Sequence, residues 1–135
     1  MLIKRALAID TAVITAFFHD HFHTENRGRV DECAVALKRQ TVSCFIAVEQ
    51  RRPVGFVCDP KGMVGPLGVD TAHRNRGIAT LLLNHCFEAM KSEGYGYAVI
   101  GWVSSATFYQ KVCGAMVVTD SEPGVYSRML SLNSD

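Results

Sequence analysis

Apolar residues near the start of the chain follow a helical spacing. A short apolar segment over Leu2–Leu7 predicts a first strand, and Asp10 and Thr11 then offer polar caps for a helix. Four apolar side chains share one face of that helix: Ala12, Val13, Ala16 and Phe17. Asn26–Gly28 ends it, and the pattern over Val30–Arg39 predicts a second helix.

The middle of the chain changes to β-branched and apolar runs divided by polar turns. Val42–Val48 and Val54–Cys58 predict two antiparallel strands, joined by the polar turn Glu49–Pro53. Met63–Val69 predicts a third strand with an interruption. Because Pro66 cannot donate a hydrogen bond to a ladder, we expect a bulge or an exposed edge at that position.

The second half alternates helices with strands. An amphipathic helix is predicted over Gly77–Gly94, and Tyr97–Val103 is apolar without alternation, as in a strand covered on both faces. Ala106–Cys113 predicts a short helix, and two final strands are predicted over Ala115–Thr119 and Val125–Leu130. This order predicts a mixed α/β or α+β sheet with helices on both faces.

Composition narrows the class of protein. The 135 residues, of which 48% are hydrophobic and 20% charged, predict one soluble domain over residues 1–135. The net charge of +1 argues against a nucleic-acid partner. Apolar runs fall short of the roughly 20 residues of a membrane span, and the start lacks a secretory pattern. Five scattered cysteines without a Cys-x-x-Cys pair predict reduced thiols in a cytoplasmic protein rather than disulfides or a zinc site.

The segment just before the long helix carries the most specific chemistry. The first turn of a helix leaves backbone N–H groups without partners, and the helix dipole makes that end positive. Here Gly77 and the small Ala79 allow a ligand to approach the backbone, while Arg74 and Arg76 add positive charge. An anion such as a pyrophosphate fits such a site. A solvated, arginine-rich loop before a core helix is the alternative.

The pattern Arg74-x-x-Gly77-x-Ala79 resembles the Gln/Arg-x-x-Gly-x-Gly/Ala signature of the GNAT N-acetyltransferase family. The resemblance extends over Val42–Val118 through three segments: "FIAVEQRRPVGFV", "PLGVDTAHRNRGIATLLL" and "YAVIGWVSSATFYQKVCGAMVV". It implies the GNAT fold, a central mixed and mostly antiparallel sheet of about six to seven strands, with about four helices. The sheet of this fold is splayed between its fourth and fifth strands.

The resemblance implies which residues bind the co-substrate, acetyl-CoA. In this family the glycine-rich corner holds the pyrophosphate mainly through backbone amides. By position, these residues are Arg74, Asn75, Arg76, Gly77, Ile78, Ala79 and Thr80. The fourth strand pairs with the pantetheine arm, which implies Leu67, Gly68 and Val69 and places Pro66 in a bulge. A plain edge-strand proline is the alternative for Pro66.

The implied reaction is direct transfer of the acetyl group from the CoA thioester to a primary amine of a small molecule or peptide. Tyr109 matches the family's general acid, because a phenol with its ordinary pKa near ~10 can protonate the departing thiolate. Packing in the core beside Phe108 is the alternative. No base is assigned, since four candidates read better as surface or structural residues: Glu49, Asp70, His73 and His85.

Other features leave the acceptor undetermined. Trp102 stands where many relatives carry Asn, so it either walls the acceptor site or fills the core. His19 and His23 share a helix face, but no third ligand is evident, and we predict no metal. A catalytically silent CoA-binding sensor or assembly module is the alternative function. A small protein-interaction domain is a third, which leaves the arginine corner unexplained. Homodimers are common in the family, and no membrane partner is expected.

Overall fold

The computed structural model of the chain describes residues 1–22, 44–58, 63–101 and 106–118. The chain divides into two compact units, Met1–Val99 and Ile100–Asp135, and each is described by itself. In the described residues, the first unit holds a central sheet with two α-helices, and the second holds one α-helix.

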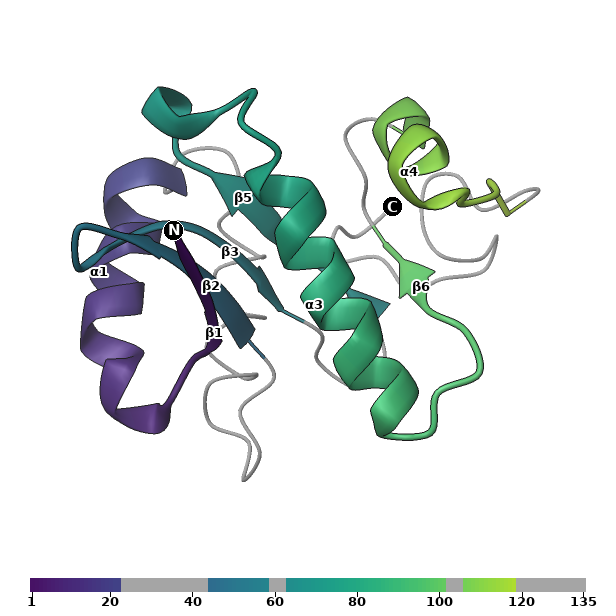
Figure 1. The fold of residues 1–135 in the computed structure, drawn as a ribbon, viewed down its shortest axis with the longest axis horizontal. Helices are drawn as coiled ribbons and strands as arrows, with labels where there is room; N and C mark the ends of the chain where they lie inside the picture. Colours follow the sequence, from purple (N-terminus) through teal and green to yellow (C-terminus); the bar gives the residue numbers. More distant parts are fainter. Residues whose placement is uncertain (23–43, 59–62, 102–105, 119–135) are drawn as a thin grey trace, which may run out of the picture. The chain divides into compact units, whose positions relative to one another are not determined.

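An antiparallel sheet of four strands lies at the centre of the first unit (Figure 1). In order across the sheet, its strands are β1 (Leu2–Arg5), β2 (Cys44–Glu49), β3 (Arg52–Cys58) and β5 (Leu67–Val69). Each strand is antiparallel to its neighbour, with Arg5 opposite Phe45 and Phe56 opposite Gly68. The mostly antiparallel sheet predicted from the sequence is confirmed.

The hairpin of β2 and β3 turns more tightly than predicted. Glu49 pairs with Arg52, so only Gln50 and Arg51 form the turn, and both have positive φ values, 49° and 64°. Two central residues with positive φ suit the right-handed twist of a two-residue hairpin. Pro53 falls inside β3 at an irregularity of the register, where the missing N–H is tolerated.

The helix α1 (Thr11–Phe22) covers one face of this sheet (Figure 1). Its buried side chains pack in one cluster with residues of β2 and β3: Ile14, Phe17, Phe18, Phe22, Cys44, Ile46, Phe56 and Cys58. The Phe56 ring lies 4.4 Å from the ring of Phe18 and 5.1 Å from that of Phe22, centroid to centroid. These aromatic contacts fix the end of α1 beside β5.

The predicted cap of this helix works differently from expectation. A short 3-10 helix, η1 (Ala8–Asp10), precedes α1, and Asp10 accepts a hydrogen bond of 2.8 Å from the N–H of Leu7. That bond lowers the pKa of Asp10, with Lys4 adding its charge at 3.1 Å. The Thr11 hydroxyl donates to the carbonyl of Ala8. Both polar residues therefore stabilise the turn before the helix.

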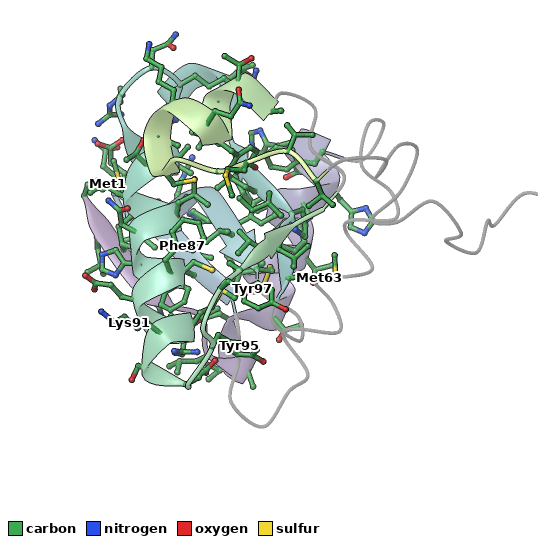
Figure 2. All side chains as sticks on the ribbon, turned by 90° about the vertical axis from the view of Figure 1, so that its right-hand side faces the viewer. Met1, Met63, Phe87, Lys91, Tyr95 and Tyr97 are labelled. Carbon is green, nitrogen blue, oxygen red and sulfur yellow. A yellow bond between two sulfur atoms is a disulfide. The ribbon has the colours of Figure 1, made fainter. Side chains whose placement is uncertain are left out.

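The helix α3 (Ile78–Ser92) covers the opposite face of the sheet (Figure 1). Its buried residues are Ile78, Leu82, Leu83, Cys86 and Met90. Gly55 of β3 makes room for it, because a Cβ at that position would lie 3.2 Å from Leu82 Cδ1. The helix ends as predicted, with Gly94 in the left-handed region at φ 98°. Tyr95 and Tyr97, which follow, are exposed (Figure 2).

The third predicted strand is divided at the predicted interruption. β4 (Met63–Val64) is hydrogen-bonded to β6 (Val99–Ile100), whereas β5 belongs to the four-stranded sheet. Between them the Gly65–Pro66 peptide bond is cis, and Pro66 is buried rather than at an exposed edge. Cys58 of β3 holds both residues, since its carbonyl accepts from Gly65 N–H at 2.8 Å and its N–H donates to the Pro66 carbonyl at 3.1 Å.

In the described residues, one predicted strand is shorter than expected and another is absent. Of Tyr97–Val103, only β6 is a strand among residues 97–101. Residues 115–118 have no regular structure, and Met116 is 89% exposed, so their apolar character does not reflect burial in a sheet. The helix α4 (Ala106–Cys113) has its predicted bounds. The helix expected over Val30–Arg39 and the strand over Val125–Leu130 lie outside the described residues.

The expectation of reduced thiols throughout is wrong for one pair of cysteines. Cys44 and Cys58 form a disulfide between β2 and β3. The hairpin register places them directly opposite one another, with Cα atoms 4.2 Å apart, and neighbouring strands bring such side chains within bonding reach. Of the other described cysteines, Cys86 is buried in α3 and Cys113 is exposed on α4. None of the helices in the described ranges is long and apolar enough to cross a membrane.

Candidate functional site

The loop between β5 and α3 adopts a backbone that its residues make possible. After β5, the 3-10 helix η3 (Thr71–His73) leads into Arg74–Gly77. Asn75 and Gly77 both have positive φ values, 62° and 78°. Asparagine and glycine are the residues that adopt this left-handed region at the lowest cost. Gly77 also faces open space, because a Cβ added there would meet nothing within 4 Å.

Gly77 is the N-cap of α3, and this makes the helix start an accessible array of donors. The cap provides no side-chain acceptor, and the first turn contains no acidic residue. The Gly77 carbonyl accepts the N–H of Leu81 at 3.1 Å, whereas the N–H groups of Ile78–Thr80 come too early for an intrahelical partner. Ile78 is buried and anchors the turn, while Ala79 and Thr80 are half-buried. The arrangement is suited to an anion.

The strand β5 presents its outer backbone edge beside this helix start. Among the strands that the structure describes, β5 is the edge strand of the four-stranded sheet and pairs with β3 alone. The Pro66 carbonyl and the Asp70 N–H bond to β3, at 3.1 and 2.9 Å. Since backbone groups alternate along an antiparallel strand, those of Leu67 and Val69 point away from β3. An extended ligand can therefore pair with the outer edge of β5.

Gly68 lies between these two residues and is tightly enclosed on the α1 face. A Cβ at Gly68 would lie 2.7 Å from Phe22 Cε1 and 2.8 Å from Phe56 Cε1. The absent side chain thus allows the end of α1 to pack directly on the strand. The predicted residues Leu67–Val69 and Arg74–Thr80 come together at one corner of the first unit.

The two arginines of the corner are held by other groups of the chain. Arg74 Nε donates to the Val69 carbonyl at 3.2 Å and ties the loop to the end of β5. Arg76 makes a two-pronged contact with Glu49, with its Nη2 2.9 Å from Oε1 and its Nη1 3.0 Å from Oε2. These hydrogen bonds, together with the charges of Arg76 and His73, lower the pKa of Glu49 to about 2, and Glu49 in turn raises the pKa of Arg76.

The Glu49 carboxylate is also part of a polar network with His73 and Asp70. His73 Nε2 lies 3.1 Å from Glu49 Oε2, and His73 Nδ1 lies 2.7 Å from Asp70 Oδ1. Asp70 is the buried member, at 8% exposure. Three of the four residues considered as bases are therefore partnered with charged groups at this corner, which fits the structural interpretation of them. His85 instead is exposed and lies near the Phe45 ring.

A comparison with protein families identifies the family of this chain. The model of the acetyltransferase (GNAT) family matches residues 10–115. The chain belongs to the GNAT acetyltransferase family. The resemblance noted in the sequence is thereby confirmed.

Solved structures share the GNAT fold of this chain. An aminoglycoside acetyltransferase from an uncultured soil metagenomic sample has 19% identity and a TM-score of 0.66, covering 87% of this chain and 93% of that one. A Brucella melitensis GNAT acetyltransferase in complex with acetyl-CoA has 18% identity and a TM-score of 0.65, covering 82% and 79%. A Pyrococcus horikoshii protein has 24% identity and a TM-score of 0.59, covering 80% of this chain but only 40% of that one. No curated protein matches the chain in sequence.

The remaining GNAT positions lie elsewhere or outside the described residues. Tyr109 lies on α4 in the second unit, half-buried, with its ring 5.0 Å from that of Phe108 in an edge-to-face contact. Trp102 and His23 fall outside the described residues. Within the parts that the structure describes, no group of three or more His, Cys, Asp or Glu could hold a metal ion. The role of Tyr109 stays a prediction.

Sequence reasoning missed the contact between Glu49 and Arg76. The two residues are 27 positions apart, and no local motif links them. The only signal is a carboxylate at the predicted end of a strand, and its partner depends on how the hairpin and the corner pack.

Proposed function

We propose that this GNAT protein is an acetyl-CoA-dependent N-acetyltransferase that moves the acetyl group directly from the CoA thioester to a primary amine. One observation carries the proposal: an uncapped helix start, opened by the left-handed Gly77, adjoins the outer edge of β5. The first feature suits a pyrophosphate and the second an extended amide chain. The Brucella melitensis relative, a complex with acetyl-CoA, supports this choice of donor.

In this proposal the donor lies along β5 and ends at α3. The pyrophosphate accepts hydrogen bonds from the N–H groups of Gly77–Thr80, with Asn75 shaping the loop and Arg74 and Arg76 adding positive charge. The pantetheine amides pair with the outward backbone groups of Leu67 and Val69, and Gly68 between them leaves room for the end of α1 on the strand. One outward N–H of β5 also stabilises the negative charge that develops on the thioester oxygen.

The reaction needs a neutral amine and a good leaving group. The amine nitrogen attacks the thioester carbonyl carbon, the carbon–sulfur bond breaks, and the nitrogen gives up a proton. Tyr109 donates a proton to the departing CoA thiolate. We assign no protein base, since Glu49, Asp70 and His73 are engaged with one another at the phosphate end of the donor. Water can accept the proton of an amine with a low pKa.

Two measurements test the proposed function. Calorimetry with acetyl-CoA is expected to show one site per chain, and a panel of primary amines is expected to include one that releases free CoA thiol. No binding of acetyl-CoA would contradict the proposal. Binding without thiol release from any amine would favour the catalytically silent CoA-binding module instead. The acceptor is left to the panel, because the aminoglycoside substrate named for one relative is not transferable at 19% identity.

A further inference from the structure

The corner that we assign to the phosphates carries its own negative charges. Arg74 and Arg76 are the two fixed cations, and Glu49 and Asp70 are two carboxylates within the same network. The two carboxylates thus offset much of the positive charge of the two arginines, while His73, when protonated, and the N-terminal ammonium add to it. A site for a strongly anionic ligand would be expected to carry an excess of positive charge.

The contact between Glu49 and Arg76 has the geometry that a phosphate would use. Both Nη atoms of Arg76 face the two carboxylate oxygens, at 2.9 and 3.0 Å, and a guanidinium binds phosphate in the same two-pronged way. The pair is open to solvent, with side-chain exposures of 44% for Arg76 and 27% for Glu49. Exposed ion pairs contribute little and exchange their partners readily.

The chain also provides a second partner for Glu49. Its Oε2 lies 3.1 Å from His73 Nε2, and Asp70 holds the other nitrogen of that ring at 2.7 Å. Because both neighbours of the ring are carboxylates, which only accept, His73 donates to Glu49 when the ring carries both of its protons, and Glu49 then keeps this contact when Arg76 turns to another anion. Glu49 remains a carboxylate at neutral pH with or without Arg76 beside it, because even its ordinary pKa of 4.5 lies well below neutrality.

We propose that Glu49 is an internal counter-ion of the corner, which holds the Arg76 guanidinium in the free protein and is displaced from it by a phosphate group of acetyl-CoA. This inference rests on the proposed function, because it requires acetyl-CoA to bind at this corner. The exchange lowers the affinity for the donor, and it favours ligands whose charge is high enough to compete with a carboxylate.

The first experiment compares two substitutions that change the net charge equally. Glu49→Gln removes the counter-ion, whereas Glu93→Gln removes a charge at the far end of α3, roughly 20 Å away at 1.5 Å per residue. By calorimetry at about 0.02 M salt, Glu49→Gln is expected to bind acetyl-CoA about two- to fivefold more tightly than the wild type, and Glu93→Gln equally tightly. The gain is expected to disappear at about 0.5 M salt.

A double-variant cycle then tests whether the gain acts through Arg76. Arg76→Gln is expected to weaken the binding of acetyl-CoA. Adding Glu49→Gln to this variant is expected to leave the affinity for acetyl-CoA unchanged. An equal gain in the Arg76→Gln background would show only long-range repulsion and would overturn the proposal. Weaker binding by Glu49→Gln with an unchanged melting temperature would overturn it as well, because the carboxylate would then position the loop.

A second substitution at Glu49 keeps the proposal testable if the Glu49→Gln protein does not fold. Glu49→Asp keeps the charge but withdraws the carboxylate by one methylene, so it is expected to loosen the contact and to give an intermediate gain in affinity. Unchanged or weaker binding by a folded Glu49→Asp protein would count against the exchange. If the wild type does not bind acetyl-CoA at either salt concentration, the proposed function itself fails, and this outcome is distinct from the others.

Discussion

Gly77 is the residue at which backbone conformation and access to the helix start coincide. It has φ 78° as the N-cap of α3, and the space beside it is open. A left-handed conformation costs other residues about 1–2 kcal/mol. An alanine at this position would relieve that strain by changing its backbone angles, and the first N–H groups of the helix would then point in other directions. Gly77→Ala is therefore expected to lower the stability slightly and the affinity for acetyl-CoA about tenfold, as measured by calorimetry.

The matched control is Gly96→Ala. Gly96 also has open space around it, but without a positive φ, so its substitution is expected to leave binding unchanged. If Gly77→Ala lost stability and still bound acetyl-CoA like the wild type, the amides of this turn would not be the phosphate site.

The ion pair of Glu49 makes the stability of the fold depend on pH, and the partners of Glu49 determine the direction of that dependence. Hydrogen bonds from Arg76 lower its pKa from 4.5 to about 2. A carboxyl group with a lowered pKa stabilises the fold fully above its unfolded value and loses that contribution as the pH falls toward the folded one. The contribution of this pair is therefore complete above pH 4.5 and decreases between pH 4.5 and about 2.

Carbon-13 NMR of the Glu49 carboxyl group measures this directly. The wild type is expected to titrate near pH 2, and Arg76→Gln is expected to bring the midpoint back toward 4.5. A midpoint near 4.5 in the wild type would mean that the ion pair is open in solution.

At the level of elements, the packing of α1 on β5 depends on one missing side chain. The rings of Phe22 and Phe56 would lie within 2.7–2.8 Å of a Cβ at Gly68. Overpacking of this kind typically costs about 1–3 kcal/mol, so Gly68→Ala is expected to lower the free energy of unfolding by about that amount. Urea denaturation measures the change, with Gly96→Ala as the neutral control. Equal stability of the two variants would show that the end of α1 does not rest on this strand in solution.

The sequence predicted those elements whose pattern is local. The bounds of α4 were predicted correctly, and so were the start of α3 after Gly77 and the interruption at Pro66. The apolar run at residues 115–118 predicted a strand wrongly, because a hydrophobic pattern does not say whether a partner strand exists. The hairpin turn was predicted too long, since neither Gln50 nor Arg51 is a typical residue for positive φ.

The candidate site also contains features that the sequence predicts and features that it does not. The loop of Arg74–Gly77 has a sequence signature, because a helix start for an anion requires particular residues at fixed spacing. The contacts of Glu49 and the disulfide of Cys44 and Cys58 have none. Both depend on the register of β2 and β3, which forms only when the chain folds, so no spacing along the sequence could reveal them.

For the whole molecule, the proposed donor site and the proposed acid belong to different units. Every residue assigned to acetyl-CoA lies within Met1–Val99, whereas Tyr109 lies within Ile100–Asp135. The proposal assigns donor binding to one set of residues and proton donation to Tyr109, so it predicts that binding of the donor and turnover respond separately to substitution. Tyr109→Phe is expected to leave the affinity for acetyl-CoA unchanged, because it removes only a hydroxyl group from the second unit.

The same variant is expected to lower kcat about 10²-fold, since a positioned general acid contributes at least that much. Thiol release with the best amine of the panel measures kcat, and calorimetry measures binding. Tyr97→Phe is the control, because this tyrosine is 82% exposed and has no assigned role (Figure 2). Unchanged turnover in Tyr109→Phe would exclude it as the acid. A parallel loss of binding and turnover would mean that Tyr109 acts by packing beside Phe108, because a proton donor to the leaving thiolate is needed only after acetyl-CoA has bound.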